Sequence, residues 1–589
     1  MEEKKLTGYP SIDKPWLKYY SPDAVSYVNE CLEYTMYQYM ESENRNRLDY
    51  IALEYFGSEI TYGAMFEKIE EVAKALRQHN VTSGDYVSVC LPNVPEIIYF
   101  IYALNKIGAV ACLIDPRTNA EGILERANDT SSKILVTVTD IIKEKINLIA
   151  HDLVAELIID VCPTDSLSVH SLKSAAIKFV YLFRKPKYSS DKFCSYKSFL
   201  KVSEGIEAST ESAFEANKAA IIVYTSGTTG TAKGVMLSNE NLIASKKLIE
   251  YGASSVDDNA SFLGVIPFFS SYGACTGMNN SLCRGWRIIM IPKFNPRHFG
   301  KLLLQNSSVS ALGVPWFWGN FAKENTPTNL SFLKNAICGG DKIAPASVEQ
   351  INKYLLQNGA SRLKIGYGAS EFGGGIVITA DTGPYEANST GEILPGVIGM
   401  VINPDTGEEL TYGEDGELCF HSPTMMLGYY KHEKETERIT LFKDGIKFYR
   451  TGDMGHITEN GTVYIVDRYK RAMMRPDGHT VHATPIENTI MQHDVVDSCA
   501  VVGLAFDKGE GVIPTAFVVL KSGDYNIKGV IDEIDTLCLK KIPERDKAHA
   551  YVVVEKLPYT PMGKFDYKLL ERYTFEELDY VVKDHTFLK

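Results

Sequence analysis

The chain has 589 residues, of which 45% are hydrophobic and 23% charged, and its formal net charge at pH 7 is -13. This length is enough for more than one hydrophobic core, and the composition is typical of a globular protein. The negative charge argues against nonspecific binding to nucleic acid, which depends on basic surface that neutralises phosphates.

The cysteines and the N-terminal sequence indicate the cellular compartment of the protein. The eleven cysteines are scattered and form no C-x-x-C pair, which argues against a disulfide framework or a zinc site. The first residues, MEEKKLTGYPSIDKPW, contain no apolar signal core, and no apolar run approaches the length of a membrane span. We therefore expect reduced thiols, no transmembrane segment and a cytoplasmic protein.

The first third of the chain is expected to form a parallel sheet. A helix is expected around residues 24–41, and from residue 51 short apolar runs alternate with segments of helical spacing such as ITYGAMFEKIEEVAKALRQ. Repeated strand–helix–strand order predicts a parallel sheet with covering helices. Residues 163–215 are more polar and irregular, and we assign them no function.

One stretch within this irregular region combines aromatic and basic residues, AAIKFVYLFRKPKY. Such a stretch suits a membrane surface or the entrance for an apolar substrate. A solvated helix or an edge loop is the simpler interpretation.

The rest of the chain predicts a second sheet, a hairpin-rich part and a smaller terminal unit. Strands and helices alternate again up to about residue 385, and turns such as PDTG, GEDG and ENG then separate short strands over residues 389–467. The fold class is α/β: a large N-terminal domain, residues 1–469, has two parallel-type sheets and a small β-barrel. A small mobile α+β domain, residues 470–589, follows a hinge in the basic run 468–475, and residues 574–583 are expected to be helical.

A loop rich in glycine and hydroxyl groups, YTSGTTGTAKGV, follows the strand-like run AAIIV at residues 219–223. Glycine N–H groups, hydroxyl donors and the charge of Lys233 suit phosphate. The spacing does not give a Walker A motif, and a flexible linker is the alternative. The candidate phosphate-binding residues are Thr225, Ser226, Gly227, Thr228, Thr229, Gly230 and Lys233.

Three further motifs carry chemistry. In GYGASE, residues 366–371, Tyr367 can stack on adenine and Glu371 can bind magnesium. In YRTGD, residues 449–453, the Asp453 carboxylate can accept hydrogen bonds from both ribose hydroxyls. In LPYTPMGK, which ends at Lys564, the lysine can hold a substrate carboxylate against the α-phosphate and offset charge in the transition state. Each motif alone could be an ordinary turn.

Together and in this order, the motifs resemble those of the adenylate-forming superfamily: acyl- and aryl-CoA synthetases, adenylation domains of peptide synthetases and firefly luciferase. The resemblance extends from about residue 51 to residue 570 and is complete over YRTGD. The family usually has proline at the position of Ala232 and threonine at that of Ser370. The resemblance implies that the protein uses ATP and Mg²⁺, with coenzyme A as a co-substrate.

The resemblance also implies roles for individual residues. Catalysis would involve Lys233, Glu371 and Lys564, and the metal would be held by Glu371 and Thr225. In ICGGDK, residues 337–342, the family commonly has alanine after the glycine pair, where this chain has Asp341. The remaining residues implied to bind ATP or AMP are Gly340, Asp341, Lys342, Gly366, Tyr367, Gly368, Ala369, Ser370, Asp453 and Arg468. Arg471 stands at the hinge position, which is usually aspartate or lysine in the family.

The acyl pocket is expected around PFFSSYG, residues 267–273, which resembles the family's P-x-x-H-x-x-G with Ser270 in place of histidine. Amino-acid-activating relatives place an aspartate near this position, and none is present here. A plain carboxylic acid, fatty or otherwise hydrophobic, is therefore favoured. Candidate acyl-pocket residues are Phe269, Ser270, Gly273, Val314, Trp316 and Gly339, although such apolar residues are also common in cores.

The expected reaction is ATP-dependent formation of an acyl-adenylate, followed by transfer to the thiol of coenzyme A with release of AMP. An acyl-AMP ligase that loads a separate carrier protein or forms an amide is an alternative. A non-catalytic nucleotide-binding relative is a second alternative, disfavoured because Lys233, Glu371, Asp453 and Lys564 are all present.

Overall fold

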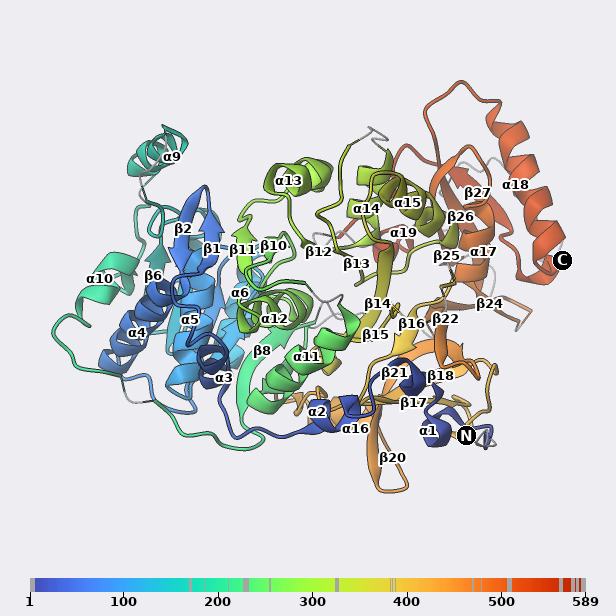
Figure 1. Ribbon diagram of the computed structural model, residues 1–589. Coiled ribbons are helices and arrows are strands. Elements are labelled where there is room, and N and C mark those ends of the chain that lie inside the picture. Colours follow the sequence, from blue (N-terminus) through green and yellow to red (C-terminus); the bar gives the residue numbers. More distant parts are fainter. Residues whose placement is uncertain are drawn as a thin grey trace.

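The structure is a computed structural model (Figure 1) that describes most of the chain. The described residues are 6–168, 172–184, 186–209, 211–225, 232–253, 256–323, 328–381, 383, 385–386, 388–468, 471–477, 479–505, 511–560, 565–573, 578 and 582–583. Within these residues, no helix is long and apolar enough to cross a membrane.

The first sheet has eight strands in the order β19-β9-β8-β4-β3-β5-β6-β7. The strands from β8 to β7 pair in parallel, whereas β9 and β19 pair antiparallel at one edge. Their bounds are β3 (Tyr86–Cys90), β4 (Val110–Leu113), β5 (Ile134–Val138), β6 (Leu157–Val161), β7 (Phe193–Ser195), β8 (Ala219–Tyr224), β9 (Gly234–Ser238) and β19 (Gly428–Tyr429).

Helices cover this sheet, as the alternating pattern predicts. The helix α5 begins at Pro95, in the first turn, where the missing N–H of proline costs no helical hydrogen bond, and all its residues are buried. It packs against α3, α4 and β4, so it needs no polar face. The helices of this part are α4 (Tyr62–Gln78), α5 (Pro95–Lys106), α6 (Ala120–Asp129), α7 (Thr139–Ile141), η2 (Ile142–Ile146), α8 (Asn147–Ile149), α9 (Leu172–Leu182), α10 (Tyr196–Lys201) and α11 (Asn239–Gly252).

The second sheet has fourteen strands along the path β17-β18-β21-β22-β16-β15-β14-β13-β12-β10-β11-β1-β2, with β20 paired to β21. The run from β1 to β14 is parallel, and the pairs from β14 to β17 are antiparallel. The predicted hairpin-rich strands therefore continue the second sheet through β14. The mixed α/β architecture expected from the sequence is confirmed.

The strands of the second sheet are β1 (Ile51–Tyr55), β2 (Ser58–Thr61), β10 (Ser261–Gly264), β11 (Arg287–Met290), β12 (Ser310–Gly313), β13 (Asn335–Cys338), β14 (Leu363–Ala369), β15 (Gly374–Ile378), β16 (Gly391–Ile393), β17 (Ile398–Ile402), β18 (Gly416–His421), β20 (Thr440–Lys443), β21 (Ile446–Ile457) and β22 (Thr462–Arg468). The helical elements between them are η3 (Tyr272–Asn279), α12 (Asn280–Cys283), η4 (Pro296–His298), α13 (Phe299–Asn306), α14 (Pro315–Lys323), α15 (Pro345–Gln357), η5 (Ser370–Phe372) and α16 (Glu433–Ile439).

The N-terminal segment forms four short helices, α1 (Pro10–Asp13), η1 (Pro15–Tyr19), α2 (Ala24–Asn29) and α3 (Met36–Glu43). The single helix expected over residues 24–41 is therefore wrong. Thr35 is extended and caps α3, accepting from the Gln38 N–H at 3.2 Å while the Gln38 side chain accepts from the Thr35 N–H. This reciprocal cap starts a new helix at Met36 and so separates it from α2.

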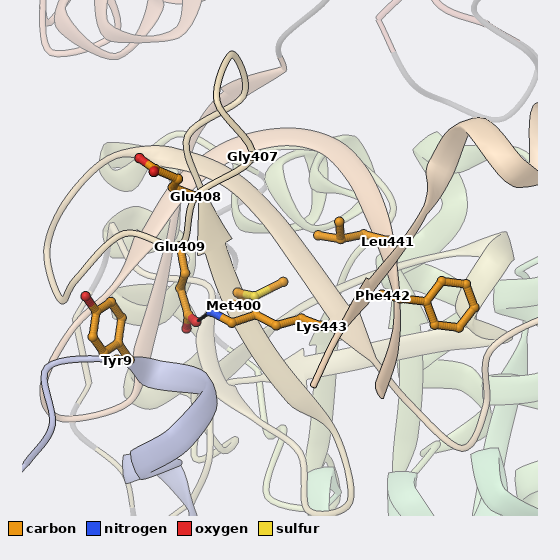
Figure 2. A pocket seen from close by; sticks show the side chains of 8 residues that line it. All are labelled: Tyr9, Met400, Gly407, Glu408, Glu409, Leu441, Phe442 and Lys443. Atoms are coloured by element: carbon orange, nitrogen blue, oxygen red, sulfur yellow. Dashed lines mark hydrogen bonds and ion pairs between the residues drawn. The ribbon is translucent and has the colours of Figure 1, made fainter. Parts of the chain in front are cut away.

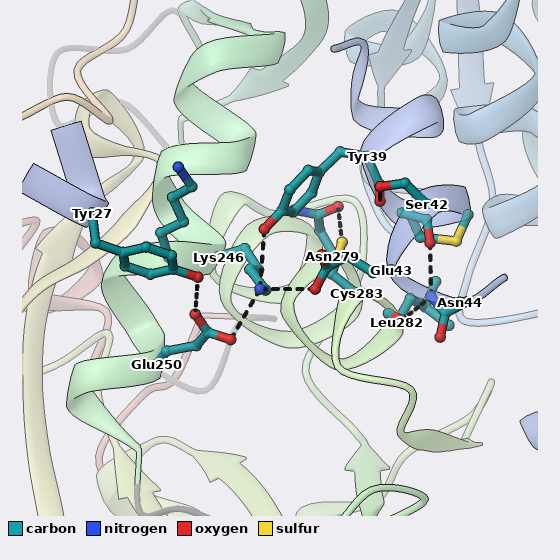
Figure 3. Close-up of polar contacts among 12 residues, drawn as sticks. Tyr27, Tyr39, Ser42, Glu43, Asn44, Lys246, Glu250, Asn279, Leu282 and Cys283 are labelled. Carbon is teal, nitrogen blue, oxygen red and sulfur yellow. Dashed lines mark hydrogen bonds and ion pairs between the residues drawn. The ribbon is translucent and has the colours of Figure 1, made fainter. Parts of the chain in front are cut away.

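A buried lysine ties the N-terminal helices to α11, the helix that follows the glycine-rich loop (Figure 3). Lys246 is 3% exposed, and its Nζ lies 3.2 Å from Glu43 and 2.9 Å from Glu250. It also donates to the Tyr39 hydroxyl at 3.1 Å, and Tyr27 donates to Glu250 at 2.7 Å. A buried ammonium with this many partners is compensated, so the cluster fixes α2 and α3 on α11.

The C-terminal part has its own sheet and its own core. Its elements are β23 (Ala472–Met474), β24 (Thr480–His482), α17 (Ala483–Ile490), β25 (Val496–Ala505), β26 (Val512–Leu520), α18 (Ile527–Lys541), η7 (Glu544–Asp546), β27 (Ala550–Val553), α19 (Tyr567–Leu570) and β28 (Val582–Lys583). The buried residues of its two clusters all follow Arg471 in the chain, whereas those of the other clusters precede it. The division into residues 1–469 and 470–589 stays a prediction that agrees with this separation.

The end of the chain differs from the expected helix over residues 574–583. Val582 and Lys583 form β28, which pairs antiparallel with Tyr551 and Ala550 of β27. Pairing along this sheet edge gives their backbone groups hydrogen-bond partners that no propensity pattern reveals. Residues 574–577 and 579–581 lie outside the described residues.

Candidate active site

The base of the glycine-rich loop lies between β8 and β9, which pair antiparallel. The Thr225 N–H donates to the Lys233 carbonyl at 3.0 Å, so these two predicted residues lie side by side where the loop leaves the sheet. The other predicted phosphate-binding residues, Ser226, Gly227, Thr228, Thr229 and Gly230, lie outside the described residues.

Tyr429 joins two charged residues predicted to act on the phosphates. Its hydroxyl donates to Glu371 Oε1 at 2.5 Å, and Lys233 Nζ lies 4.9 Å from the centre of its ring. Burial and the neighbouring Glu371 carboxylate both raise the pKa of Tyr429, so the phenol stays protonated and donates. Sequence reasoning missed this tyrosine, because it stands 58 residues from Glu371 in the two-residue strand β19.

The two residues predicted to hold the nucleoside are in direct contact. The Tyr367 hydroxyl donates to Asp453 Oδ2 at 2.7 Å, although β14 and β21 are not neighbouring strands. Asp453 is 8% exposed, and its N–H donates to the Thr451 hydroxyl at 3.0 Å. Its ladder partner on β22 is Arg468, whose side chain is outside the described atoms. The residues predicted to bind adenine and ribose, which belong to two separate motifs, therefore lie next to each other.

The GYGASE loop is fixed by contacts to other predicted segments. Ser271 Oγ donates to Ser370 Oγ at 3.1 Å, and the Met426 N–H donates to the Glu371 carbonyl at 2.8 Å. A Cβ at Gly368 would lie 1.8 Å from the Gly374 carbonyl oxygen, so only glycine fits there. Ala369 ends β14 beside it and is partly buried.

The ICGGDK turn follows β13 and has Gly340 at φ +82°, a left-handed conformation that favours glycine. The next residue, Asp341, accepts from the Lys342 N–H at 2.9 Å and from the Phe565 N–H at 3.3 Å. Lys342 Nζ donates to the Val466 carbonyl at 3.0 Å. Asp341 therefore contacts the small domain, and Lys342 contacts β22, the strand that leads to it.

Burial lowers the pKa of Lys342 to about 8, although the carboxylates of Asp467 and Glu487 act in the opposite direction. A lysine that changes charge near neutral pH at a domain contact is unusual. The physical cause is removal of the ammonium from water without a close carboxylate partner at hydrogen-bond distance.

Several candidate acyl-pocket residues meet next to the nucleotide residues. A Cβ at Gly339 would lie 3.1 Å from the Gly366 carbonyl oxygen and 3.4 Å from the Tyr272 hydroxyl. A Cβ at Gly340 would lie 3.7 Å from Val314, which is buried. Gly339 and Gly340, which follow β13, therefore lie close to Val314 after β12, to Gly366 within β14 and to Tyr272 at the start of η3.

The three remaining acyl-pocket candidates have different surroundings. Ser270 Oγ donates to the Pro267 carbonyl at 2.7 Å and accepts from the Gly273 N–H at 3.2 Å, so this hydroxyl closes the turn before η3. The Phe269 side chain is 6% exposed, with the Arg117 guanidinium 5.1 Å from its ring centre. Trp316 instead stacks on Tyr559 of the C-terminal part at 5.1 Å.

Arg471, the predicted hinge residue, bridges the strand before it and the small domain after it. Its guanidinium lies 2.6 Å from Glu487 and 3.8 Å from Asp467, and 3.9 Å from the ring centre of Tyr567. Burial opposes its charge, but the neighbouring carboxylates, Glu487 above all, raise its pKa. Lys564 lies outside the described residues, directly before Phe565, which contacts Asp341.

A separate hollow of about 570 Å³ lies on the β20–β21 side of the molecule (Figure 2). Its lining residues are Tyr9, Met400, Gly407, Glu408, Glu409, Leu441, Phe442 and Lys443. None of them is a predicted site residue, and Lys443 is paired with Glu409. Among the described residues, no group of three or more His, Cys, Asp or Glu side chains could hold a metal ion by itself.

Two family patterns match the chain. The family described as AMP-binding enzyme matches residues 40–430, and the AMP-binding enzyme C-terminal domain matches residues 485–564. A probable 4-coumarate–CoA ligase 3 of Dictyostelium discoideum is 30% identical over 467 residues, which cover 78% of this chain and 80% of that protein. A long-chain-fatty-acid–CoA ligase of Bacillus subtilis strain 168 is 26% identical, with 96% of this chain and 98% of that protein covered.

Solved structures show the same fold. The ATP-bound crystal structure of MatB from Rhodopseudomonas palustris superposes with a TM-score of 0.76 at 22% identity, covering 92% of this chain and 98% of that chain. An amide bond synthetase, McbA from Marinactinospora thermotolerans, superposes with a TM-score of 0.74 at 18% identity, covering 91% of this chain and 99% of that chain.

Proposed function

This chain belongs to the AMP-binding enzyme family, and from that premise we propose that it joins a hydrophobic carboxylic acid to coenzyme A by way of an acyl-adenylate. The family forms adenylates from ATP, so the enzyme class itself is established by membership. The contact of Tyr367 with Asp453 and the contacts of Tyr429 with Glu371 and Lys233 support this assignment, because together they link the GYGASE, YRTGD and glycine-rich motifs.

We propose that the nucleotide binds across these contacts. Asp453 would accept from the ribose hydroxyls, and Tyr367 would stack on adenine. Lys233 and the loop after Thr225 would neutralise the β- and γ-phosphates. One or two protein oxygens plus substrate phosphates are the usual ligands of Mg²⁺, so Glu371 and Thr225 fit a magnesium ion that offsets phosphate charge.

In the first half-reaction, a carboxylate oxygen of the acid would attack the α-phosphate and pyrophosphate would leave. Lys564 would hold the two reacting groups together and offset the charge that develops on the phosphorus oxygens. In the second half-reaction, the small domain would turn about Arg471. The thiolate of coenzyme A would then attack the acyl carbonyl, with AMP as the leaving group.

The choice of acid rests on the surroundings of the first turn of η3. Phe269 and Val314 are buried and apolar, and no aspartate stands in PFFSSYG to bind an α-ammonium group. The two relatives act by name on 4-coumarate and on long-chain fatty acids, which are both hydrophobic acids. We therefore propose a fatty or aromatic acid as the substrate class.

We also propose that the reaction takes place in the cytoplasm. All eleven cysteines are free, and eight of the eleven, among them Cys90 and Cys275, are buried. Free thiols in this number suit a reducing compartment.

The test is acid-dependent release of pyrophosphate from ATP across aliphatic, aromatic and amino acids, with and without coenzyme A. Release is expected with hydrophobic acids and should be lost in Lys564→Ala, whereas the exposed neighbour Lys556→Ala serves as the control. The absence of pyrophosphate release with every acid tested would refute the proposed adenylation activity. Release without thioester formation would refute coenzyme A as the acceptor and favour a carrier protein or an amine.

A further inference from the structure

The helix α9 projects from the body of the molecule (Figure 1), and exposed apolar side chains form a stripe along it. Ala176, Phe179, Val180 and Phe183 follow the spacing i, i+3, i+4, i+7, which places them on one face of a helix. Phe179 is 62%, Val180 48% and Phe183 77% exposed, and the two phenylalanine rings lie 5.1 Å apart. A surface helix normally turns polar side chains outward at these positions.

The inner face of α9 is already satisfied, so the exposed stripe is not a consequence of poor packing. Ile177 packs against the main hydrophobic core. One turn later, the Tyr181 hydroxyl donates to Asp140 at 2.9 Å, and Arg184 lies 3.6 Å from the same carboxylate. These contacts fix which face of the helix points to solvent.

The charge around this stripe is opposite to that of the rest of the chain. The segment 172–188 contains five basic residues and no acidic residue, whereas the whole chain has a net charge of -13. Lys178 is partly exposed, and Lys187 is exposed beyond the end of the helix. An apolar stripe flanked by lysine and arginine matches the interface of an anionic bilayer, where rings enter the headgroup region and cations meet phosphates.

We propose that α9 is a docking surface for anionic lipid bilayers and holds the enzyme at the membrane surface without crossing it. The proposal goes beyond the adenylation reaction and does not depend on it, since it concerns a surface distant in sequence from every predicted site residue. Hydrophobic acids partition into bilayers, so an enzyme bound to the membrane surface would be close to its proposed substrates.

A second copy of this chain is a poorer occupant of the same face. Like-charged segments would be brought together, and a helix of 11 residues offers too little surface for a stable dimer, which buries on the order of 1,200 Å² or more. A lipid surface needs no complementary shape, so three exposed apolar side chains and their basic neighbours are sufficient for reversible binding.

The experiment is co-sedimentation of the full chain with vesicles of phosphatidylcholine containing phosphatidylserine, and with vesicles of phosphatidylcholine alone. Binding is expected to the anionic vesicles only, and to weaken as salt is added because screening shortens the range of the attraction. The double variant Phe179→Ser/Phe183→Ser is expected to bind about tenfold more weakly or worse. The variant Lys178→Gln/Lys187→Gln is expected to lose several-fold in affinity and part of the salt dependence.

A matched control removes an equally exposed ring elsewhere. Phe442, on β20, is 68% exposed, so Phe442→Ser removes one ring of similar exposure from another element and is expected to leave vesicle binding unchanged. Equal binding by the Phe179/Phe183 variant and the wild type would overturn the proposal, as would the absence of binding to anionic vesicles. A dimer in solution that the double variant abolishes would show that a second copy occupies the face instead. Pyrophosphate release with a short water-soluble acid, measured without vesicles, should be the same in all these variants.

Discussion

At the scale of single residues, Tyr429 separates two charges that would otherwise attract each other directly. Its phenol donates to Glu371, and its ring faces the ammonium of Lys233. A direct lysine–carboxylate pair would compete with phosphate for the cation and with magnesium for the carboxylate. The tyrosine instead contacts both groups, and we propose that it holds them in place for the phosphates and the magnesium ion.

Tyr429→Phe should therefore change the magnesium requirement. The phenyl ring keeps the contact with Lys233 but loses the hydrogen bond that orients Glu371. We expect the Mg²⁺ concentration for half-maximal pyrophosphate release to rise about tenfold, the usual effect of losing a group that orients a metal ligand. Tyr430→Phe is the control, since Tyr430 faces Tyr86. An unchanged Mg²⁺ dependence would show that Tyr429 only packs there.

Lys342 should make the stability of the protein depend on pH in the alkaline range. Its pKa is about 8 in the folded chain and 10.5 ordinarily, so folding disfavours its protonated form. The resulting penalty, on the order of 3 kcal/mol, is fully present below pH 8 and disappears as the pH rises to 10.5. In Lys342→Met there is no such proton, so the stability of the wild type relative to this variant should rise across that range.

The measurement is urea unfolding of the wild type and the variants between pH 7 and pH 10.5. Lys342→Arg is the matched control, because arginine stays charged throughout and its difference from the methionine variant should be constant with pH. A flat difference between the wild type and Lys342→Met would mean that Lys342 keeps its proton in the folded chain. Closer ion pairing of the Lys342 ammonium with Asp467 or Glu487 would explain that result.

At the scale of elements, three contacts close the small domain onto the large one. Trp316 at the start of α14 stacks on Tyr559, with the planes 23° apart. Lys323 at the end of the same helix pairs with Asp497 at 2.5 Å, and Asp341 accepts from the Phe565 N–H. These contacts bring the segment that adjoins Lys564 to the nucleotide residues.

Tyr559→Ala should slow the first half-reaction more than the second. Loss of the stack weakens the closed arrangement by about 1 kcal/mol, the usual value for an aromatic pair, and so lowers the rate of adenylate formation several-fold. Thioester formation from a supplied acyl-adenylate should change little, because it uses another domain position. Tyr573→Ala, which removes a 45% exposed ring of the same domain, is the control. Equal losses in both steps would contradict a specific role in closure.

Local motifs were predictable from the sequence where the chemistry lies within a few residues. GYGASE, YRTGD and the glycine-rich loop each carry donors, acceptors and glycines at a fixed short spacing, and the alternation of strands and helices followed from hydrophobic periodicity. Contacts between distant segments were not predictable. Tyr429 meets Glu371 only because β19 joins the edge of the first sheet, and the break between α2 and α3 depends on a cap that competes with helix propensity.

At the scale of the whole molecule, the hydrophobic clusters divide at the segment around Arg471. Each side buries its own apolar residues, and the contacts across the division include an aromatic stack, an ion pair and a hydrogen bond. The small domain would therefore change position without exposing a core.

A chain that ends at residue 469 should fold without the small domain. We expect one cooperative unfolding transition and a rise of its midpoint on addition of ATP, because Tyr367, Glu371 and Asp453 are all retained. Acid-dependent pyrophosphate release should fall about 100-fold or more with the loss of Lys564. The full chain with Lys564→Ala is the control for the catalytic loss alone. A truncated chain that aggregates or shows no response to ATP would place the domain boundary elsewhere.

Asp453 and Arg468 are ladder partners at the end of the large domain, and we propose that this pair keeps its position when the small domain moves. Arg468 ends β22, the last strand before that domain, and its neighbour across the ladder is the carboxylate proposed to bind ribose. We therefore propose that the axis of rotation lies beside the nucleotide, on the part of the large domain that does not move. Pyrophosphate would leave and the thiol would arrive as the small domain rotates, while AMP would stay bound in one position. AMP should accordingly be the last product to dissociate, and it should inhibit competitively against ATP.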